Sequence, residues 1–451
     1  MNTDFEALRA EAEEALAPAF RRIGRIAQKN TEKVLAAFRK NCVAATHFAA
    51  SDGYGYNDRG RELIEASYAE VFGTEAALVR HSVANGTHAL TIGLFGLLRP
   101  GDTLLSVTGT LYDTLRGVVE RKTGEGTLPD FGIRYRQLEF DRSSGREEID
   151  YPALGQLLSG DPTIKVVYAQ RSRGYDARRT LSPEELNTLA DFVHERSSAF
   201  VMVDNCYGEF VDETEPCHAD LFVGSLIKNP GGGMADSGAY FAGTRRAVEL
   251  AACRMTVPGI GGEVGASLGQ NKNIFRGLFF APHVVAEALK TAQLAAYVFS
   301  RMGYAVSPAA GEVRQDIIQT VELGSADALC AFCRGLQENS PIDSFLTPEP
   351  WDMPGYDDQV IMAAGAFVNG SSIELSADGP LRPPFRVYLQ GGLTYESGSI
   401  GILGAARRVA EAKKLGFTTC ILPRVCMDGL QSTDGIRLVP VNNVREAIDI
   451  I

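Results

Sequence analysis

The sequence predicts a two-domain α/β fold, in which helices cover a large and mostly parallel sheet and a smaller α+β domain follows. The chain has 451 residues, 45% of them hydrophobic, which is enough for two packed domains. Between residues 75 and 245, short β-rich runs alternate with helical stretches. From about residue 300 the pattern is mixed, and no internal repeat or low-complexity linker interrupts it. We therefore expect two domains that pack closely.

The N-terminal part is predicted to form a helical arm followed by an interface loop. Apolar residues recur at helical spacing from Phe5 to Leu35, which indicates helix. A loop rich in glycine, tyrosine and charged residues follows, from Asp52 to Arg61. We divide the chain into the arm and interface loop (1–60), a large domain (61–290) and a small C-terminal domain (291–451).

Six short apolar runs are the candidate strands of the large domain. One pair is joined by a recognisable helix, because Ser182 can cap its start, Pro183 suits the first helical position and helical residues continue to about Arg196. This helix and the runs on either side of it form a βαβ unit. The six runs are 76–80, 103–107, 164–170, 199–204, 221–227 and 239–242.

The composition argues against several classes of partner. A formal net charge of -12 opposes the phosphate backbone of nucleic acid and the anionic surface of a membrane. The N-terminus lacks the apolar core of a signal peptide, and no apolar run approaches the roughly eighteen residues that cross a bilayer. We expect a cytoplasmic protein that acts on small molecules, with no nucleic-acid or membrane partner.

The eight cysteines and six histidines show no metal-binding pattern. The cysteines are scattered, which is typical of reduced thiols in a cytosol. Cys330 and Cys333 lie in a C-A-F-C segment, but no second pair follows and the surrounding pattern predicts an amphipathic helix. The histidines lack HExxH spacing, and Val264 stands where a dinucleotide fingerprint needs glycine. We therefore predict no metal site.

A carboxylate and an amine follow two candidate strands. Asp204 ends one apolar run, and Lys228 follows another, just after Ser225 and before three glycines. Open α/β sheets bind ligands at the carboxyl ends of their strands, so both groups are expected at one edge. Pyridoxal phosphate needs this pair, an amine that forms an imine and an acid that keeps the ring nitrogen protonated. Singly, Asp204 could be a turn residue and Lys228 a solvated lysine, and Lys272 is the chief rival for the imine.

A phosphate site is predicted where the chain turns from a candidate strand into an apolar helix, through Asn85-Gly86-Thr87-His88. Free N–H groups at a helix start bind anions. Ser225, on another candidate strand, can add a hydroxyl. His88 could equally be a capping or core residue.

Tyr112 follows the candidate strand at 103–107. An aromatic ring at this edge could stack on a cofactor ring, or it could simply close a turn. The chain order of phosphate loop, aromatic residue, aspartate and lysine favours stacking. Tyr112 is therefore counted with Lys228 and Asp204 among the candidate catalytic residues.

This order, with Val-Asp-Asn before Ser-x-x-Lys, resembles the fold-type-I pyridoxal-phosphate enzymes of cysteine and methionine metabolism. Four segments are similar to the methionine gamma-lyase-like family often called aluminium resistance proteins, and the similarity runs from about residue 45 to the end. It implies an aspartate-aminotransferase-like fold and a homodimer or homotetramer with shared active sites. The segments are Tyr54-Gly-Tyr-Asn-Asp-Arg-Gly-Arg61, Gln170-Arg-Ser-Arg-Gly-Tyr175, Lys228-Asn-Pro-Gly-Gly-Gly and Tyr388-Leu-Gln-Gly-Gly-Leu-Thr-Tyr395.

The resemblance also implies contacts between subunits. In the related lyases a Tyr-x-Arg segment reaches the phosphate of the neighbouring subunit. Here Tyr54, Tyr56, Arg59 and Arg61 form a looser version of that segment. We expect Tyr56 and Arg59 at the cofactor and Tyr54 at the substrate.

Related enzymes also hold the substrate carboxylate with an arginine of the small domain. Arg386 is our choice over Arg382, since a planar guanidinium there suits a two-point carboxylate contact. The lyase pattern has Asn-Pro where this chain has Gln170-Arg-Ser-Arg173. Arg173 is therefore included among the candidate substrate-binding residues.

Together these residues predict a pyridoxal-phosphate-dependent lyase that cleaves the C–S bond of a sulfur-containing amino acid of the cystathionine or methionine type. The substrate amine displaces Lys228, the freed amine removes the α-proton, and a thiolate leaves from the β or γ carbon. The alternatives are transamination, decarboxylation or aldol cleavage with the same cofactor. A non-catalytic cofactor-binding protein linked to metal tolerance is a further alternative.

Overall fold

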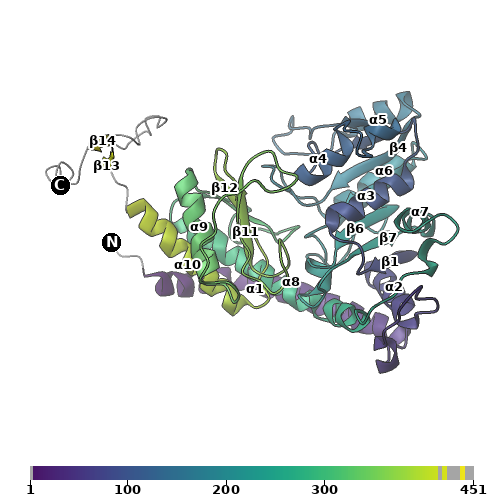
Figure 1. Cartoon of the computed structure of the whole chain (residues 1–451), viewed down its shortest axis with the longest axis horizontal. Helices are drawn as coiled ribbons and strands as arrows, with labels where there is room; N and C mark the ends of the chain where they lie inside the picture. The colour runs from purple at the N-terminus through teal and green to yellow at the C-terminus, as the bar shows by residue number, and fades with distance from the viewer. Residues whose placement is uncertain (1–3, 415–418, 424–436, 442–451) are drawn as a thin grey trace.

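The computed structural model describes residues 4–414, 419–423 and 437–441. It confirms the two-domain α/β fold, with a seven-stranded sheet in the large domain and a five-stranded sheet in the small domain (Figure 1). Residues 1–3 of the predicted arm lie outside the described residues. The same holds for 415–418, 424–436 and 442–451 of the predicted small domain.

The large sheet is mostly parallel, as predicted. Its order is β1-β7-β6-β5-β4-β2-β3, and β7 runs antiparallel to both of its neighbours while the other pairs are parallel. All six predicted runs are strands. The seventh strand, β3, was missed because its side chains are polar and mostly exposed. The strands are β1 (Ala76–Arg80), β2 (Thr103–Ser106), β3 (Arg134–Gln137), β4 (Ile164–Gln170), β5 (Phe200–Asp204), β6 (Leu221–Ser225) and β7 (Ala239–Gly243).

Helices cover both faces of this sheet (Figure 1). Successive residues of β5 show this, because Val201 and Val203 pack in one buried cluster and Met202 packs in another. A strand that is buried on both faces has a continuous run of apolar residues, and this run predicts β5 from the sequence. The helices are α2 (Arg59–Phe72), α3 (Gly86–Leu97), α4 (Asp113–Val119), α5 (Tyr151–Gly160), α6 (Pro183–His194) and α7 (Arg245–Met255).

The start of α6 is built as the sequence predicts. Pro183 is its first residue, and Ser182 caps it by accepting a hydrogen bond from the Glu185 N–H at 3.1 Å. The Glu185 carboxylate accepts the Ser182 N–H at 2.9 Å in return. This reciprocal pair fixes the helix start, so the connection from β4 to β5 has a defined entry.

Two long helices connect the domains. The predicted arm is α1 (Phe5–Lys40), and it packs along α8 (Asn271–Arg301). Leu16 of α1 belongs to the small-domain core and Val34 to the large-domain core. Since α8 passes unbroken through residue 290, the division of the chain at that point stays a prediction.

The small-domain sheet is antiparallel, with strand order β10-β11-β12-β9-β8. Its core includes Cys330 and Cys333, which lie on an amphipathic helix, α9, as their pattern predicts. A separate parallel pair is formed by β13 and β14. The elements are β8 (Ala305–Ser307), β9 (Gln319–Glu322), α9 (Ala326–Glu338), β10 (Val360–Ala363), β11 (Ser376–Pro380), β12 (Arg386–Gln390), α10 (Tyr395–Lys414), β13 (Thr419–Pro423) and β14 (Arg437–Val441).

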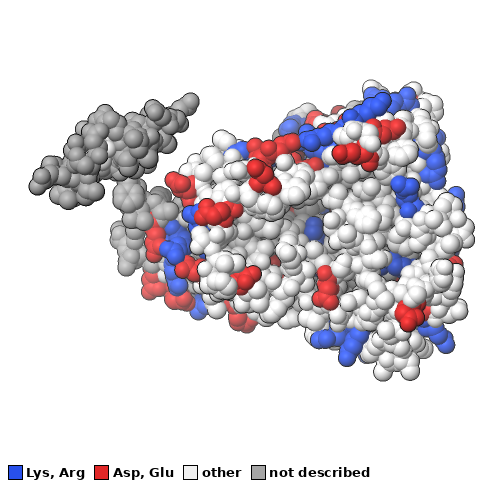
Figure 2. Space-filling view, viewed as in Figure 1, with Lys and Arg blue, Asp and Glu red and all other residues white. Residues whose placement is uncertain are grey.

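The surface shows no gathering of one charge on the face seen in Figure 2, where acidic and basic side chains are interspersed. Within the described ranges, no helix combines the length and apolar character that a bilayer crossing requires. The described residues also include no cluster of three or more histidine, cysteine, aspartate or glutamate side chains that could hold a metal ion.

Candidate active site

The carboxyl ends of β4, β5 and β6 bring the first candidate residues together. Gln170 ends β4 and is the register partner of Asp204, which ends β5. Asp204 is in turn paired with Val223 of β6, two residues before Ser225. Because the three strands are parallel and adjacent, their last side chains share one edge of the sheet. The structure thus groups Asp204 and Ser225 as predicted.

Asp204 is a buried carboxylate, with 7% of its surface exposed. It accepts a hydrogen bond from the Cys206 N–H at 3.1 Å. Burial raises the pKa of Asp204, and the positive charges of Lys228 and Arg178 act in the opposite direction. Asp204 is therefore a buried carboxylate with a positive charge nearby.

Lys228 is half-buried and directly precedes the short helix Asn229–Gly231. Its Nζ lies 3.8 Å from the ring centroid of Tyr207. Burial lowers the pKa of the amine, but nearby Cys206, Tyr207 and Asp204 outweigh it, so the net shift is upward. The rival Lys272 is exposed in the first turn of α8. Of these two lysines, only Lys228 faces Asp204.

The predicted phosphate loop lies against the same strand ends. Asn85 caps α3 by accepting the His88 N–H at 2.8 Å. A Cβ atom on Gly86 would lie 3.3 Å from the Cys206 Sγ and 3.8 Å from the Ser225 Cβ. Glycine therefore lets the helix start approach the strand edge closely, because a side chain at this position would crowd Cys206.

Two other residues of this loop make local contacts. The Thr87 hydroxyl lies 2.6 Å from that of Thr114, which ties α3 to α4. The exposed His88 accepts the Ala84 N–H on its Nδ1 at 3.1 Å. In the structure His88 acts as a capping residue of the loop, which is one of the two roles that the sequence left open.

Tyr112 joins the site from the start of α4. Its N–H donates to the Gln170 side chain at 3.1 Å. Its hydroxyl forms a short hydrogen bond with that of Tyr356, and its ring packs edge-on against Tyr175 with centroids 5.9 Å apart. Burial raises the pKa of Tyr112 well above the usual phenol value. Tyr112 therefore lies at the seam between the domains.

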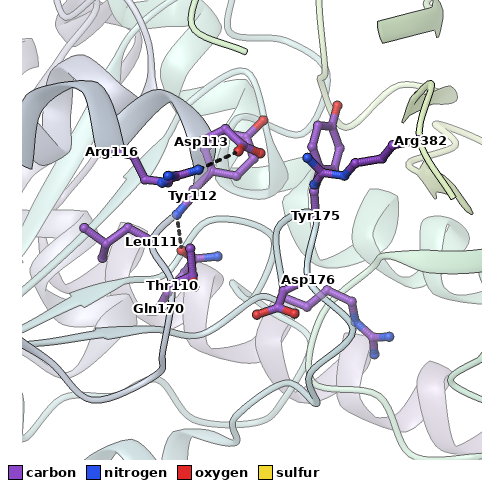
Figure 3. A pocket seen from close by; sticks show the side chains of 10 residues that line it. Thr110, Leu111, Tyr112, Asp113, Arg116, Gln170, Tyr175, Asp176 and Arg382 are labelled. Atoms are coloured by element: carbon purple, nitrogen blue, oxygen red, sulfur yellow. Dashed lines mark hydrogen bonds and ion pairs between the residues drawn. The ribbon is translucent and has the colours of Figure 1, made fainter. Parts of the chain in front are cut away.

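A cavity of about 180 Å³ opens beside Tyr112. In Figure 3, Tyr112 and Arg116 enter from one side, and Tyr175 and Arg382 from the other. Arg116 and Arg382 are already paired with carboxylates, at 3.2 Å with Glu120 and 2.7 Å with Asp358. The remaining lining residues include Arg173.

Arg173 differs from its neighbour Arg171. Arg171 is fully buried and bonded to Glu215 at 3.0 Å and Asn205 at 2.8 Å. Arg173 is only 4% exposed, donates to the Ser307 hydroxyl at 2.9 Å and forms no ion pair within the described ranges. Its Nε is buried without a partner. Arg173 is thus free to bind an anionic group.

Arg386, the predicted carboxylate ligand, lies elsewhere. It is on β12 and forms a short ion pair with Glu322 of the adjacent strand β9. It does not line the cavity beside Tyr112, whereas Arg382 does. The structure therefore brings Arg173 and Arg382, and not Arg386, to that cavity.

The interface loop presents Tyr54 and Tyr56 to the surface, 73% and 58% exposed and stacked on each other with centroids 5.6 Å apart. Arg59, the first residue of α2, is exposed too. Arg61 instead is buried and donates to the carbonyl oxygens of Gly55 and Gly265, at 2.8 and 2.5 Å. Arg61 holds the loop in place, while the other three remain available to a partner.

The sequence did not single out the small-domain residues at this site. Tyr356 reaches Tyr112, and the carboxylate of Asp378 on β11 lies beside Tyr175 and Lys228. Neither residue follows the end of a parallel strand, and neither belongs to a local motif. Their only sequence signal is a polar residue within a strand that is otherwise buried, at Asp378.

The seven-stranded sheet of the large domain and the smaller five-stranded C-terminal sheet are those of the fold-type-I class of pyridoxal-phosphate-dependent enzymes. A pyridoxal-phosphate-dependent protein from Escherichia coli, YhfS, shares this fold with a TM-score of 0.57 at 17% identity, over 87% of this chain and 97% of that one. More narrowly, the family model described as methionine gamma-lyase matches residues 5–410. The chain belongs to this family.

Closer relatives carry a more specific description. A proposed cystathionine beta-lyase involved in aluminium resistance from Listeria monocytogenes is 43% identical with a TM-score of 0.86, over 90% of this chain and 100% of that one. A carbon-sulfur lyase involved in aluminium resistance from Clostridium novyi is 46% identical with a TM-score of 0.85, over 90% and 96%. The uncharacterised protein YnbB of Bacillus subtilis is 48% identical over 390 residues, 85% of this chain and 91% of that one.

Proposed function

We propose that this protein is a pyridoxal-phosphate-dependent lyase that breaks the C–S bond of a sulfur-containing amino acid. The observation that carries the proposal is the placement of Asp204 and Lys228 at one edge of the sheet, with the charge of each acting on the pKa of the other. The description of the Clostridium novyi relative as a carbon-sulfur lyase supports the reaction type.

The residues present fit the cofactor. Lys228 supplies the amine, Asp204 the acid partner of the ring nitrogen, and Tyr112 an aromatic ring at the same edge. The start of α3 at Gly86, which lies close to Ser225, suits the phosphate. When bound, pyridoxal phosphate supplies an electron-accepting ring that stabilises a carbanion at the substrate α carbon.

The protein groups then divide the work. Lys228, displaced by the substrate amine, takes the α-proton on Nζ as general base. Asp204 keeps a negative charge beside the ring nitrogen, which favours the protonated ring. Arg173 has an unpartnered guanidinium nitrogen at the cavity wall and is our first candidate for the substrate carboxylate, ahead of Arg386 and Arg382, which already have partners.

The leaving sulfur needs a proton, since a thiol departs more easily than a thiolate. Tyr112 is the candidate donor, because its hydroxyl is hydrogen-bonded to Tyr356 beside the cavity. Burial raises the pKa of Tyr112, so the phenol keeps its proton at neutral pH and can give it to the sulfur. Both β-elimination and γ-elimination would use this proton donor.

The reaction is tested by incubating the purified protein, loaded with pyridoxal phosphate, with cystathionine, cysteine and methionine. Release of a keto acid together with a thiol is the expected result. If the amino acids yield only their transaminated partners, or carbon dioxide, the lyase assignment is wrong.

We further propose that Tyr56 and Arg59 act across a subunit interface in a homodimer or homotetramer. Their exposure supports this, because Arg59 and the stacked pair Tyr54 and Tyr56 project from the protein while Arg61 anchors their loop. Mixing inactive Lys228→Ala subunits with inactive Arg59→Ala subunits should restore activity, since a mixed dimer regains one intact site. Subunit exchange without recovery would contradict a shared site.

We also propose that the protein acts in the cytoplasm on a small-molecule substrate. In the described ranges the cysteines are free thiols, which supports a reducing compartment such as the cytoplasm. The net charge of -12 and the mixed surface of Figure 2 support a small-molecule substrate rather than a nucleic-acid or membrane partner.

A further inference from the structure

One buried carboxylate at the site is not used by the proposed mechanism. Asp378 lies on β11, a strand flanked on both sides by β10 and β12, and only 5% of the residue is exposed. The Ser371 hydroxyl donates to its Oδ2 at 3.0 Å. The segment before β11 is bonded to the chain beside Lys228, because the Ile373 N–H donates to the Ile227 carbonyl at 3.0 Å. This bond holds the segment before β11 against the chain beside Lys228, and the charge of Lys228 acts on Asp378.

Aromatic rings surround this carboxylate. Tyr175 packs with Tyr388 at a centroid distance of 4.8 Å and with Tyr356 at 5.6 Å, which joins rings of both domains. Aromatic faces carry negative charge and attract cations. The rings therefore supply no positive charge to balance Asp378.

A cation is the missing partner. Within the described ranges, no lysine or arginine forms an ion pair with Asp378, and the nearest positive charge that acts on its pKa is Lys228. Burial raises the pKa of Asp378 to about 6, even though Ser371, Tyr175 and Lys228 lower it. The group is thus charged at neutral pH, and a buried charge without a partner is costly to keep. A buried carboxylate that accepts a hydrogen bond from Ser371 but forms no ion pair with a lysine or arginine of the described ranges, within electrostatic reach of Lys228, points to a cationic ligand.

We propose that Asp378 binds the α-ammonium group of the incoming amino acid. The inference rests on the proposed function and deepens it. An amino acid arrives as a zwitterion, and its amine must come to the position of Lys228 in order to displace it. Asp204 is assigned to the ring nitrogen and Arg173 to the substrate carboxylate. Of the carboxylates that line the cavity, Asp113 lies 3.7 Å from Arg116 and Asp176 is exposed, whereas Asp378 is buried and within electrostatic reach of Lys228, which favours Asp378 as the anion for the ammonium. Binding in this way orients the amine toward the cofactor and selects amino acids over simple carboxylates.

The test compares Asp378→Asn with wild type in the holoenzyme. Asparagine has nearly the same size and keeps an acceptor for Ser371, but it lacks the charge. We expect KM for methionine to rise about tenfold to a hundredfold, with a smaller change in kcat. The inhibition constant of 3-(methylthio)propionate, which is methionine without its amine, should stay unchanged or fall. Ser371→Ala is the matched control, because it removes the hydrogen bond and keeps the charge.

A second readout does not depend on turnover. Asp378→Asn removes an unbalanced buried charge, so its melting temperature at pH 8 should be equal to or above that of wild type. Saturating methionine should raise the melting temperature of wild type more than that of the variant, whereas 3-(methylthio)propionate should raise both equally. This comparison decides the proposal even if no sulfur-containing amino acid is cleaved.

The affinity of wild type for methionine should also depend on pH. It should be full above pH 6 and weaken as pH falls through about 6, where Asp378 becomes protonated, and Asp378→Asn should lose this dependence. Asp204 also acts on Lys228, and burial raises the pKa of Asp204, but Asp204 is unchanged in Asp378→Asn, so a pH dependence that this variant keeps belongs to Asp204. Burial raises the pKa values of the other facing groups, Tyr112, Tyr175, Tyr356 and Cys333, above their ordinary values, and the neighbours of Lys228 raise its pKa.

Three results would overturn the proposal. In the first, Asp378→Asn unfolds at a lower temperature and loses kcat with KM unchanged, which indicates a structural role. In the second, Asp378→Asn lowers the affinity for methionine and for 3-(methylthio)propionate equally, which means that Asp378 does not bind the ammonium group. In the third, only substrates with a second, distal ammonium group lose affinity, which assigns Asp378 to the substrate side chain instead.

Discussion

The two domains supply the candidate active site in different ways. In the large domain, Asp204 and Lys228 follow the ends of two adjacent strands, and a short turn is enough to place them. In the small domain, Asp378 lies in the middle of β11, and the Ile373 N–H bonds the segment before this strand to the Ile227 carbonyl of the large domain. The first arrangement depends on local chain order, whereas the second depends on how the domains pack. We therefore distinguish a cofactor side of the proposed site, formed by Asp204 and Lys228, from a substrate side, formed by Arg173 and Asp378. The following experiments test this distinction.

The largest effect is expected at Lys228, on the cofactor side. Lys228→Ala removes both the cofactor amine and the general base, so C–S cleavage should fall by about 10³-fold or more. The native protein should be yellow, and the variant should lose the colour of the bound cofactor. Lys272→Ala is the matched control and should keep both colour and activity. Borohydride reduction that fixes the cofactor to Lys272 would falsify the assignment.

Asp204 should show the next largest effect. Asp204→Asn keeps the size of the side chain but removes the charge that favours a protonated ring. With saturating pyridoxal phosphate, α-proton removal should slow by about 10²-fold, or about 3 kcal/mol of barrier. Hydrogen exchange at the substrate α carbon measures this step. An Asp204→Asn rate equal to that of Asp191→Asn, an exposed control on α6, would make Asp204 a structural turn residue.

On the substrate side, the comparison is between two arginines. Arg173→Gln should raise KM about tenfold, because Arg173 forms no ion pair with a carboxylate of the described residues and only its proposed contact with the substrate would be lost. Arg386→Gln breaks the pair with Glu322 on the small-domain sheet and should change KM much less. Steady-state kinetics with one substrate distinguish them. A larger rise in KM for Arg386→Gln than for Arg173→Gln would mean that Arg386 binds the substrate carboxylate and that the carboxylate does not bind in the cavity beside Tyr112.

The smallest effect is expected on the pH dependence of the free energy of unfolding, through a buried glutamate of the large domain. Glu209 is fully buried and accepts a hydrogen bond from the Tyr240 hydroxyl at 2.8 Å, and burial raises its pKa to about 8. Between its ordinary pKa of 4.5 and about 8 the folded protein binds more protons than the unfolded chain, so the free energy of unfolding should fall as pH rises. Glu209→Gln should flatten the melting temperature over this range. Glu125→Gln, on the surface, should leave the pH profile unchanged.

The same division explains what could be predicted from the sequence. The six apolar runs of the large sheet could be predicted because buried strands of a parallel sheet have few polar residues. The strand β3 could not be predicted in this way because it is polar and mostly exposed. Asp204, Gly86 and Ser225 could be placed because parallel strand ends share one edge. Arg386 is predicted over Arg382 from the resemblance to enzymes that hold the substrate carboxylate with an arginine of the small domain, and no local pattern could reveal the ion pair between Arg386 and Glu322. Asp378 and Tyr356 could not be found, because their position depends on domain packing.

The continuity of α1 through both hydrophobic cores has a mechanical consequence. Leu16 is packed in one core and Val34 in the other, on a single helix that lies along α8. A rigid rotation of one domain about a flexible linker would pull one of these side chains out of its core. We therefore expect relative motion of the domains to proceed by small sliding of packed helices, or by bending of α1 at Pro18, which lies between these two residues. Large openings of the active site are excluded unless α1 itself bends or detaches.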